Sequence, residues 1–162
     1  MLQSASMSIC TALLVGQNQV APVEERGRVR VFVDTSALVA LSVLPDVNSA
    51  RARRIAHRLS RGDGLVGTTA ILTEFHSYIL YRRGIEAARR VVAALLLDPL
   101  HHWLPVSRDL VEAAAQNWLT RFSDQKFSLV DAISFEAMRR EKITQAFSFD
   151  RHFVVAGFDL IT

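Results

Sequence analysis

The stretch RVRVFVDTSALVAL, residues 28–41, joins an apolar segment to an abrupt run of polar side chains. Its β-branched residues predict a buried strand over 29–33, and the second apolar segment predicts a short helix over 36–43. Asp34 lies between them. Ligands of open parallel sheets bind beyond the carboxyl ends of the strands, so a carboxylate at this position is a candidate functional group.

Strand and helix patterns alternate along the rest of the chain. We expect further strands at 65–67, 102–106, 144–148 and 158–161, and helices at 47–60, 69–83, 85–97, 107–121, 129–141 and 150–155. Such alternation is typical of an α/β fold with a parallel sheet and helices on both of its faces.

Composition indicates one folded domain. The chain has 162 residues, half of them apolar, with a mean hydropathy of +0.20, which argues against disorder. We expect residues 1–27 to form a flexible N-terminal extension and residues 28–162 to form the domain. The apolar run at 9–15 is too short to span a membrane, and the single cysteine, Cys10, cannot form an internal disulfide. A reducing cytoplasm is therefore the expected location.

Four acidic residues lie next to predicted strand ends or in predicted helices: Asp34, Glu74, Asp131 and Asp150. Each also has an ordinary structural explanation. Asp34 and Asp150 are suited to cap the helical segments that follow them, and Ser128 with Asp131 forms a capping-box pattern. Glu74 is suited to a solvent-facing position, although it lies beside the apolar face of its predicted helix.

Together, the four carboxylates predict a cation site. If the strand ends align, two carboxylates 4 Å apart repel each other by about 4 kcal/mol at an effective dielectric constant of 20. Protonation or a bound cation would relieve that repulsion, and oxygen ligands favour Mg²⁺ or Mn²⁺ over zinc. The five histidines have no metal-ligand spacing, and the sequence contains no phosphate-binding glycine loop and no nucleophile elbow.

Arginine supplies most of the positive charge. The net charge is +3, and 17 of the 19 basic residues are arginines. Two groups are candidates for RNA binding, because guanidinium groups match phosphates and a helical spacing aligns the first group. They are Arg51, Arg54 and Arg58, followed by Arg61, and Arg82 and Arg83, near Arg89 and Arg90. A solvated helix face opposite Ala52, Ile55 and Leu59 explains the first group equally well.

Four segments, VFVDTSALVAL, TEF, KFSLVDAISFEAM and FSFDRHF, resemble in order the motifs of PIN-domain ribonucleases. The closest resemblance is to the toxins of VapBC-type toxin–antitoxin pairs. It implies a three-layer α/β/α sandwich around a mainly parallel sheet and a metal-dependent endoribonuclease with one or two Mg²⁺ or Mn²⁺ ions. Position by position, it implies that Asp34, Glu74, Asp131 and Asp150 are the catalytic, metal-binding quartet.

The resemblance also implies supporting residues and partners. Thr35, Ser36 and Ser128 match hydroxyl positions of the family, and Asp124 matches an acid found in some members. A cognate antitoxin, an RNA substrate and a homodimer are the expected partners. The alternative is a catalytically inactive PIN-like module that binds RNA or a protein. A phosphohydrolase acting on a small molecule is disfavoured, because Ser36 stands where a phosphatase signature requires aspartate.

Overall fold

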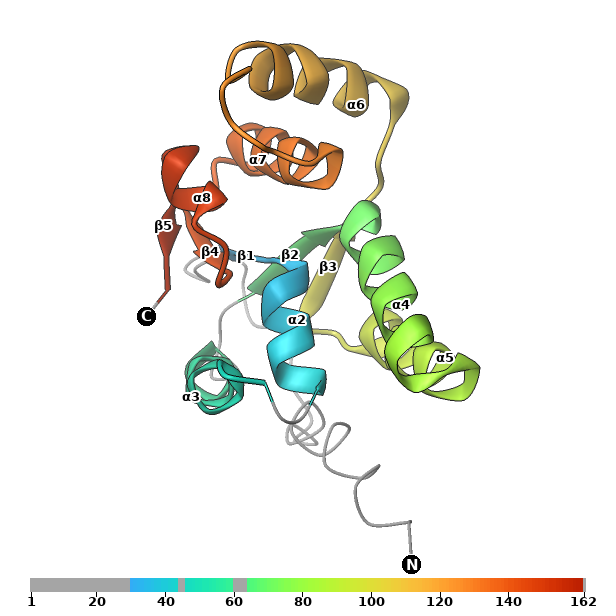
Figure 1. The fold of residues 1–162 in the computed structure, drawn as a ribbon. Helices are drawn as coiled ribbons and strands as arrows, with labels where there is room; N and C mark the ends of the chain where they lie inside the picture. The colour runs from blue at the N-terminus through green and yellow to red at the C-terminus, as the bar shows by residue number, and fades with distance from the viewer. Residues whose placement is uncertain (1–29, 44–45, 60–63, 162) are drawn as a thin grey trace, which may run out of the picture.

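The computed structural model describes residues 30–43, 46–59 and 64–161, so the expected extension at 1–27 lies outside the described residues. The described strands form one parallel sheet in the order β3-β2-β1-β4-β5 (Figure 1). They are β1 (Arg30–Val33), β2 (Gly64–Thr68), β3 (His101–Leu104), β4 (Gln145–Phe147) and β5 (Asp159–Leu160). The predicted parallel sheet is thus confirmed, with strand boundaries that differ from the expected ones by at most two residues.

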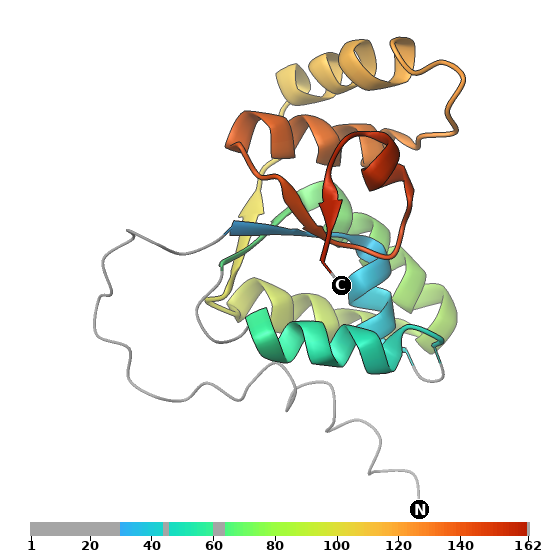
Figure 2. The same cartoon turned by 90° about the vertical axis from the view of Figure 1, so that its left-hand side faces the viewer.

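Helices cover both faces of the sheet. They are α2 (Thr35–Ser42), α3 (Ser49–Leu59), α4 (Thr69–Arg83), α5 (Ile85–Leu97), α6 (Arg108–Ala114), α7 (Leu129–Glu141) and α8 (His152–Val155). Figure 2 shows α6 and α7 stacked on one side of the sheet, and α2 to α5 on the other. This arrangement confirms the three-layer α/β/α sandwich that the family resemblance implies.

The central strand β1 explains why its sequence is continuously apolar. Val31, Phe32 and Val33 are all buried, because β1 pairs with β2 on one side and with β4 on the other while helices cover both faces. Strands buried on both faces carry uninterrupted apolar runs. The ring of Phe32 packs 6.1 Å from that of Phe153 in α8, which ties the C-terminal part of the chain to the core.

The helix expected over 107–121 begins as predicted but does not stay regular. Ser107 caps α6 by accepting a hydrogen bond from the Leu110 N–H, and the helix then widens into a π-helical segment, Ala115–Thr120. The widened segment buries Trp118 against α7. No helix in the described part of the chain is long and apolar enough to cross a membrane.

Candidate active site

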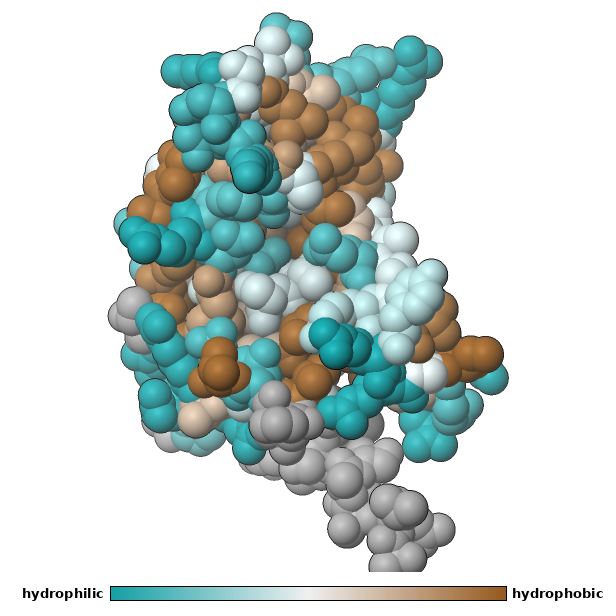
Figure 3. Space-filling view, in the orientation of Figure 1, coloured by the Kyte–Doolittle hydropathy of each residue, from teal (hydrophilic) through white to brown (hydrophobic). Residues whose placement is uncertain are grey.

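From β1 the chain adds β2 and β3 on one side of the sheet, and then β4 and β5 on the other side of β1. The carboxyl ends of β1 and β4 therefore form a topological switch point. The two strands stay joined there, because the Asp34 N–H donates a 3.1 Å hydrogen bond to the carbonyl of Phe147. Figure 3 shows polar side chains gathering in the middle of the face on which the N-terminal ends of α2 and α4 approach α7 and α8. Open α/β sheets place their ligands in such a crevice.

Asp34 caps α2 and is held from several directions. Its Oδ2 accepts hydrogen bonds from the Ser36 N–H at 3.1 Å, the Ser36 hydroxyl at 2.6 Å and the Ser148 hydroxyl at 2.8 Å. Burial raises the pKa of Asp34 above its ordinary value, although these hydrogen bonds act in the opposite direction. The carboxylate is therefore fixed in position, while its surroundings disfavour its negative charge.

Glu74 lies in the second turn of α4, whose first turn is capped by the side chain of Thr68. The Thr35 hydroxyl donates a hydrogen bond to Glu74 Oε2, so consecutive residues after β1 hold two acids. Partial burial raises the pKa of Glu74, and the negative charges of the other three acids, Asp34, Asp131 and Asp150, raise it further. The other three acids of the predicted quartet are therefore close enough to Glu74 to act on its charge.

Asp131 and Asp150 approach each other from α7 and from the segment after β4. The predicted capping box is present: the Ser128 N–H donates to Asp131 Oδ2 at 2.8 Å, and the Asp131 N–H donates to Ser128 Oγ at 3.0 Å. Asp150 Oδ1 accepts the His152 N–H at 2.8 Å. A carboxylate of this protein can therefore cap a helical segment and also belong to the acidic group.

Sequence reasoning missed His152. Its Nδ1 lies 3.4 Å from Asp131 Oδ2 and 3.5 Å from Asp150 Oδ2, and its ring packs edge-on against Phe127 at 5.3 Å. No metal-ligand spacing marks this histidine. The signal that could have identified it is its position two residues after Asp150. The hydrogen bond from the His152 N–H to Asp150 forms a turn that keeps the imidazole ring close to the carboxylates.

Hydroxyl and backbone groups hold the four carboxylates. Within the described chain, the hydrogen bonds given above reach Asp34 Oδ2, Glu74 Oε2, Asp131 Oδ2 and Asp150 Oδ1. Carboxylate oxygens held in this way are suited to bind a cation. One ligand atom each from Asp131, Asp150 and His152 lies within 4.8 Å of the other two, a separation that a single ion can bridge.

The structure brings some of the other expected residues to this group and leaves others apart. Thr35, Ser36 and Ser128 hold the acids as described above. Asp124 is exposed in the turn before α7 and accepts a hydrogen bond from its neighbour Gln125, so the structure does not bring it to the quartet. The two arginine groups lie on α3 and in the last turn of α4, and Arg61 lies outside the described residues.

Comparison with known sequences finds matches over most of the chain. The family model described as "PIN domain" matches residues 31–159. The 23S rRNA-specific endonuclease VapC20 of Mycobacterium tuberculosis, from strains CDC 1551 / Oshkosh and H37Rv, is 34% identical to this chain over 128 residues. The match covers 79% of this chain and 95% of the relative.

Comparison with solved structures gives the same result for the fold. The crystal structure of M. tuberculosis VapC20, described as a sarcin-ricin loop cleaving toxin, has a TM-score of 0.71 and 34% identity, covering 79% of this chain and 95% of that one. A toxin–antitoxin complex from Klebsiella pneumoniae has a TM-score of 0.51 over 82% of this chain and 96% of that one. At 13% identity, it indicates a shared fold alone.

Proposed function

The chain belongs to the PIN-domain family, and on this premise we propose that it is an endoribonuclease, the toxin of a toxin–antitoxin pair. It hydrolyses RNA phosphodiester bonds with the help of Mg²⁺ or Mn²⁺ held by Asp34, Glu74, Asp131 and Asp150. One observation carries the proposal: four carboxylates from four separate segments gather at the switch point, where hydroxyl and backbone groups hold them.

The donor set fits a hard divalent cation. Carboxylate oxygens predominate, with one imidazole nitrogen at the edge, a combination that suits Mg²⁺ or Mn²⁺ better than zinc. Within the described residues, no lysine or arginine forms an ion pair with any of the four acids. When bound, the cation would supply the positive charge that draws the RNA phosphate and a water molecule of lowered pKa.

The protein's own part in catalysis is to hold the carboxylates before RNA arrives. Ser36 and Ser148 keep Asp34 from rotating, and Thr35 does the same for Glu74. Electrostatic catalysis is most effective when the charged groups are already in position and need not reorganise during the reaction. Hydrogen bonds that hold the carboxylates therefore increase the rate. In-line attack of water on the phosphorus would break its bond to the 3′ oxygen. The products would be a 5′-phosphate and a 3′-hydroxyl, as the family resemblance implies.

Ribosomal RNA is the substrate class that the relatives favour. VapC20 is named as specific for 23S rRNA, and 95% of its length aligns with this chain. We propose that this chain acts on RNA, is silenced by a cognate antitoxin, forms a homodimer and is located in the cytoplasm. A supporting observation for the antitoxin would be a small open reading frame beside this gene whose product co-purifies with the chain.

A cleavage assay with paired metal conditions tests the proposal. Purified ribosomes and deproteinised rRNA are incubated with wild-type protein and with Asp34→Asn, each with Mn²⁺ and with EDTA. We expect discrete cuts by the wild type with Mn²⁺ only, and a loss of at least about 100-fold in Asp34→Asn. In parallel, Mn²⁺ at 100 times its dissociation constant should stabilise the wild type by about 2.7 kcal/mol, and Asp34→Asn by less.

The outcomes separate the candidate functions. Equal cutting by both proteins would indicate a contaminating nuclease. RNA binding without any cutting, in folded protein freed of antitoxin, would favour the catalytically inactive module. Mn²⁺ stabilisation that persists unchanged in Asp34→Asn would remove Asp34 from the metal-binding set, whatever the cleavage result.

A further inference from the structure

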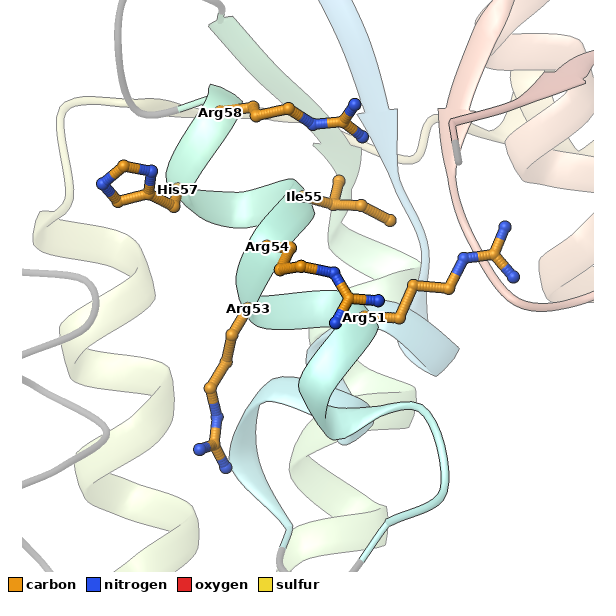
Figure 4. Close-up of a pocket in the computed structure, with 6 residues that line it drawn as sticks. All are labelled: Arg51, Arg53, Arg54, Ile55, His57 and Arg58. Carbon is orange, nitrogen blue, oxygen red and sulfur yellow. The ribbon is translucent and has the colours of Figure 1, made fainter.

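Helix α3 carries a dense patch of positive charge next to the acidic site. The segment Ser49–Leu59 reads SARARRIAHRL and has no acidic residue. A depression of about 570 Å³ runs along it, lined by Arg51, Arg53, Arg54, Ile55, His57 and Arg58 (Figure 4). Among the described residues, none of the ion pairs involves Arg51, Arg53 or Arg54.

The arginines of α3 lie on two different sides of the helix. Ala52, Ile55 and Leu59 are buried and define the inner face. Helical spacing places Arg51, Arg54 and Arg58 along one flank of this face and Arg53 on the opposite flank. Figure 4 shows the first three extending to the same side of the helix, while Arg53 extends away from them. We call Arg51, Arg54 and Arg58 the α3 flank.

A direct contact links the α3 flank to the acidic site. The guanidinium of Arg51 lies over the ring of Phe149, 5.7 Å from its centroid. Phe149 stands between Ser148, which holds Asp34, and Asp150, a member of the quartet. Its backbone N–H donates a 2.9 Å hydrogen bond to Ser36 Oγ, and its ring packs against Phe147 at 6.1 Å. Arg51 is therefore supported by a residue that is itself tied to the site.

The chemistry of the α3 flank matches a phosphate backbone. Guanidinium groups offer several N–H donors in a planar fork, and residues three and four apart on a helix lie about 4.5 Å and 6 Å apart along its axis. A polyanion that approaches the four carboxylates also needs a nearby region of positive charge. Arg82 and Arg83 differ, because they lie two turns beyond Glu74 on α4, where Arg82 packs over the Tyr78 ring at 5.6 Å.

We infer that the α3 flank, with Arg51 supported by Phe149, is the surface that binds the RNA backbone leading into the acidic site. This inference rests on the proposed function and assigns it a substrate path. The α3 flank contributes affinity and orientation, whereas the carboxylates act on the phosphate that is cut. Arg53, on the same helix and also exposed, lines the same depression but extends away from the α3 flank, and we place it outside the path.

Single substitutions on one helix test the assignment, because each removes the same charge. We would compare Arg51→Ala, Arg54→Ala and the double variant with Arg53→Ala as the matched control. The probe is a fluorescently labelled RNA hairpin carrying the sarcin–ricin loop, titrated in EDTA at several salt concentrations. A contact to single-stranded RNA contributes about 0.7 to the salt slope, so each loss should weaken binding about fourfold at 0.15 M salt and the double loss about tenfold or more.

Cleavage of the same hairpin with Mn²⁺ gives a second readout. We expect Arg54→Ala to raise KM and leave kcat unchanged, and Phe149→Leu to reproduce part of the binding loss of Arg51→Ala. An equal loss in Arg53→Ala would indicate diffuse attraction and overturn the inference. Unchanged RNA affinity in the double variant would overturn it too, and weaker antitoxin capture by that variant would then assign the α3 flank to an acidic protein surface.

This design keeps the inference separate from the proposed function. If the wild type binds the hairpin through the α3 flank but cuts no RNA under any metal condition, the function fails and the RNA path stands. If the wild type cuts RNA while all the arginine variants bind and cut alike, the function stands and the RNA path fails.

Discussion

The acids of the quartet and Glu136 differ in the groups that surround their carboxylates. Glu136 is fully buried in α7, and both of its oxygens accept hydrogen bonds. The donors are Arg139 at 2.7 and 3.0 Å, Arg140 at 2.9 Å, and Asn117 and Trp118 at 3.2 Å each. These hydrogen bonds, led by those of Arg139, lower the pKa of Glu136 to about 2 despite its burial.

The quartet lacks such compensation. Hydroxyl and backbone groups hold its carboxylates, the described arginines do not pair with them, and burial raises the pKa of both Asp34 and Glu74. Glu136 carries its charge among complete partners, whereas the clustered charges of the quartet have no basic partner among the described residues, a pattern typical of sites where a ligand supplies the counter-charge. From this difference we expect a structural role for Glu136 and a functional role for the quartet.

The same substitution at the two places should have opposite consequences for activity. We expect Glu74→Gln to lower the rate of RNA cleavage at least about 100-fold, because it removes a charge from the metal-binding group. Glu136→Gln should leave the rate unchanged at temperatures where the variant is folded. Single-turnover cleavage with Mn²⁺ measures both, and an active Glu74→Gln would remove Glu74 from the catalytic set.

The pH dependence of stability should also differ between the two acids. The pKa of Glu136 falls from an ordinary value of 4.5 to about 2 in the folded protein. Its contribution, about 3 kcal/mol, is therefore present above pH 4.5 and lost as the pH falls through 2. Urea unfolding of wild type and Glu136→Gln over this range, in EDTA, isolates that contribution as the difference between the two curves. Parallel curves would contradict the assigned role.

At neutral pH, Glu136→Gln should lower the free energy of unfolding by about 2 kcal/mol, because hydrogen bonds to a charged group are weakened. Glu112→Gln is the matched control. Glu112 pairs with Arg108 at 2.6 Å, but both side chains are exposed, so its loss should cost less than about 1 kcal/mol. Equal losses in the two variants would mean that burial adds nothing to the Glu136 interactions.

The smallest expected effect is on the stability of the metal-free site. In EDTA at neutral pH, Glu74→Gln should leave the free energy of unfolding unchanged or raise it by up to about 0.5 kcal/mol, since it removes repulsion that solvent partly screens. Chemical unfolding with matched wild-type protein measures the difference. A clear loss of stability would show that the hydrogen bond with Thr35 matters more than the repulsion.

Sequence pattern predicted the layers of the fold because each element carries its own signal. The apolar run at 29–33 indicated a buried strand, and the Ser128–Asp131 capping-box pattern marked a helix start that the structure has. The π-helical widening of Ala115–Thr120 had no such signal, because it depends on how Trp118 packs against α7.

For the site, sequence pattern was enough to identify the candidate residues and to show that four acids stand at or near strand ends and helix starts. The folded arrangement was needed to show which oxygens are held, that His152 joins Asp131 and Asp150, and that Asp124 instead contacts its neighbour Gln125. It also separated Arg53 from the α3 flank and linked Arg51 to Phe149. A residue's chemistry and helical position are local properties, whereas burial, charge compensation and convergence depend on segments more than a hundred residues apart in the chain.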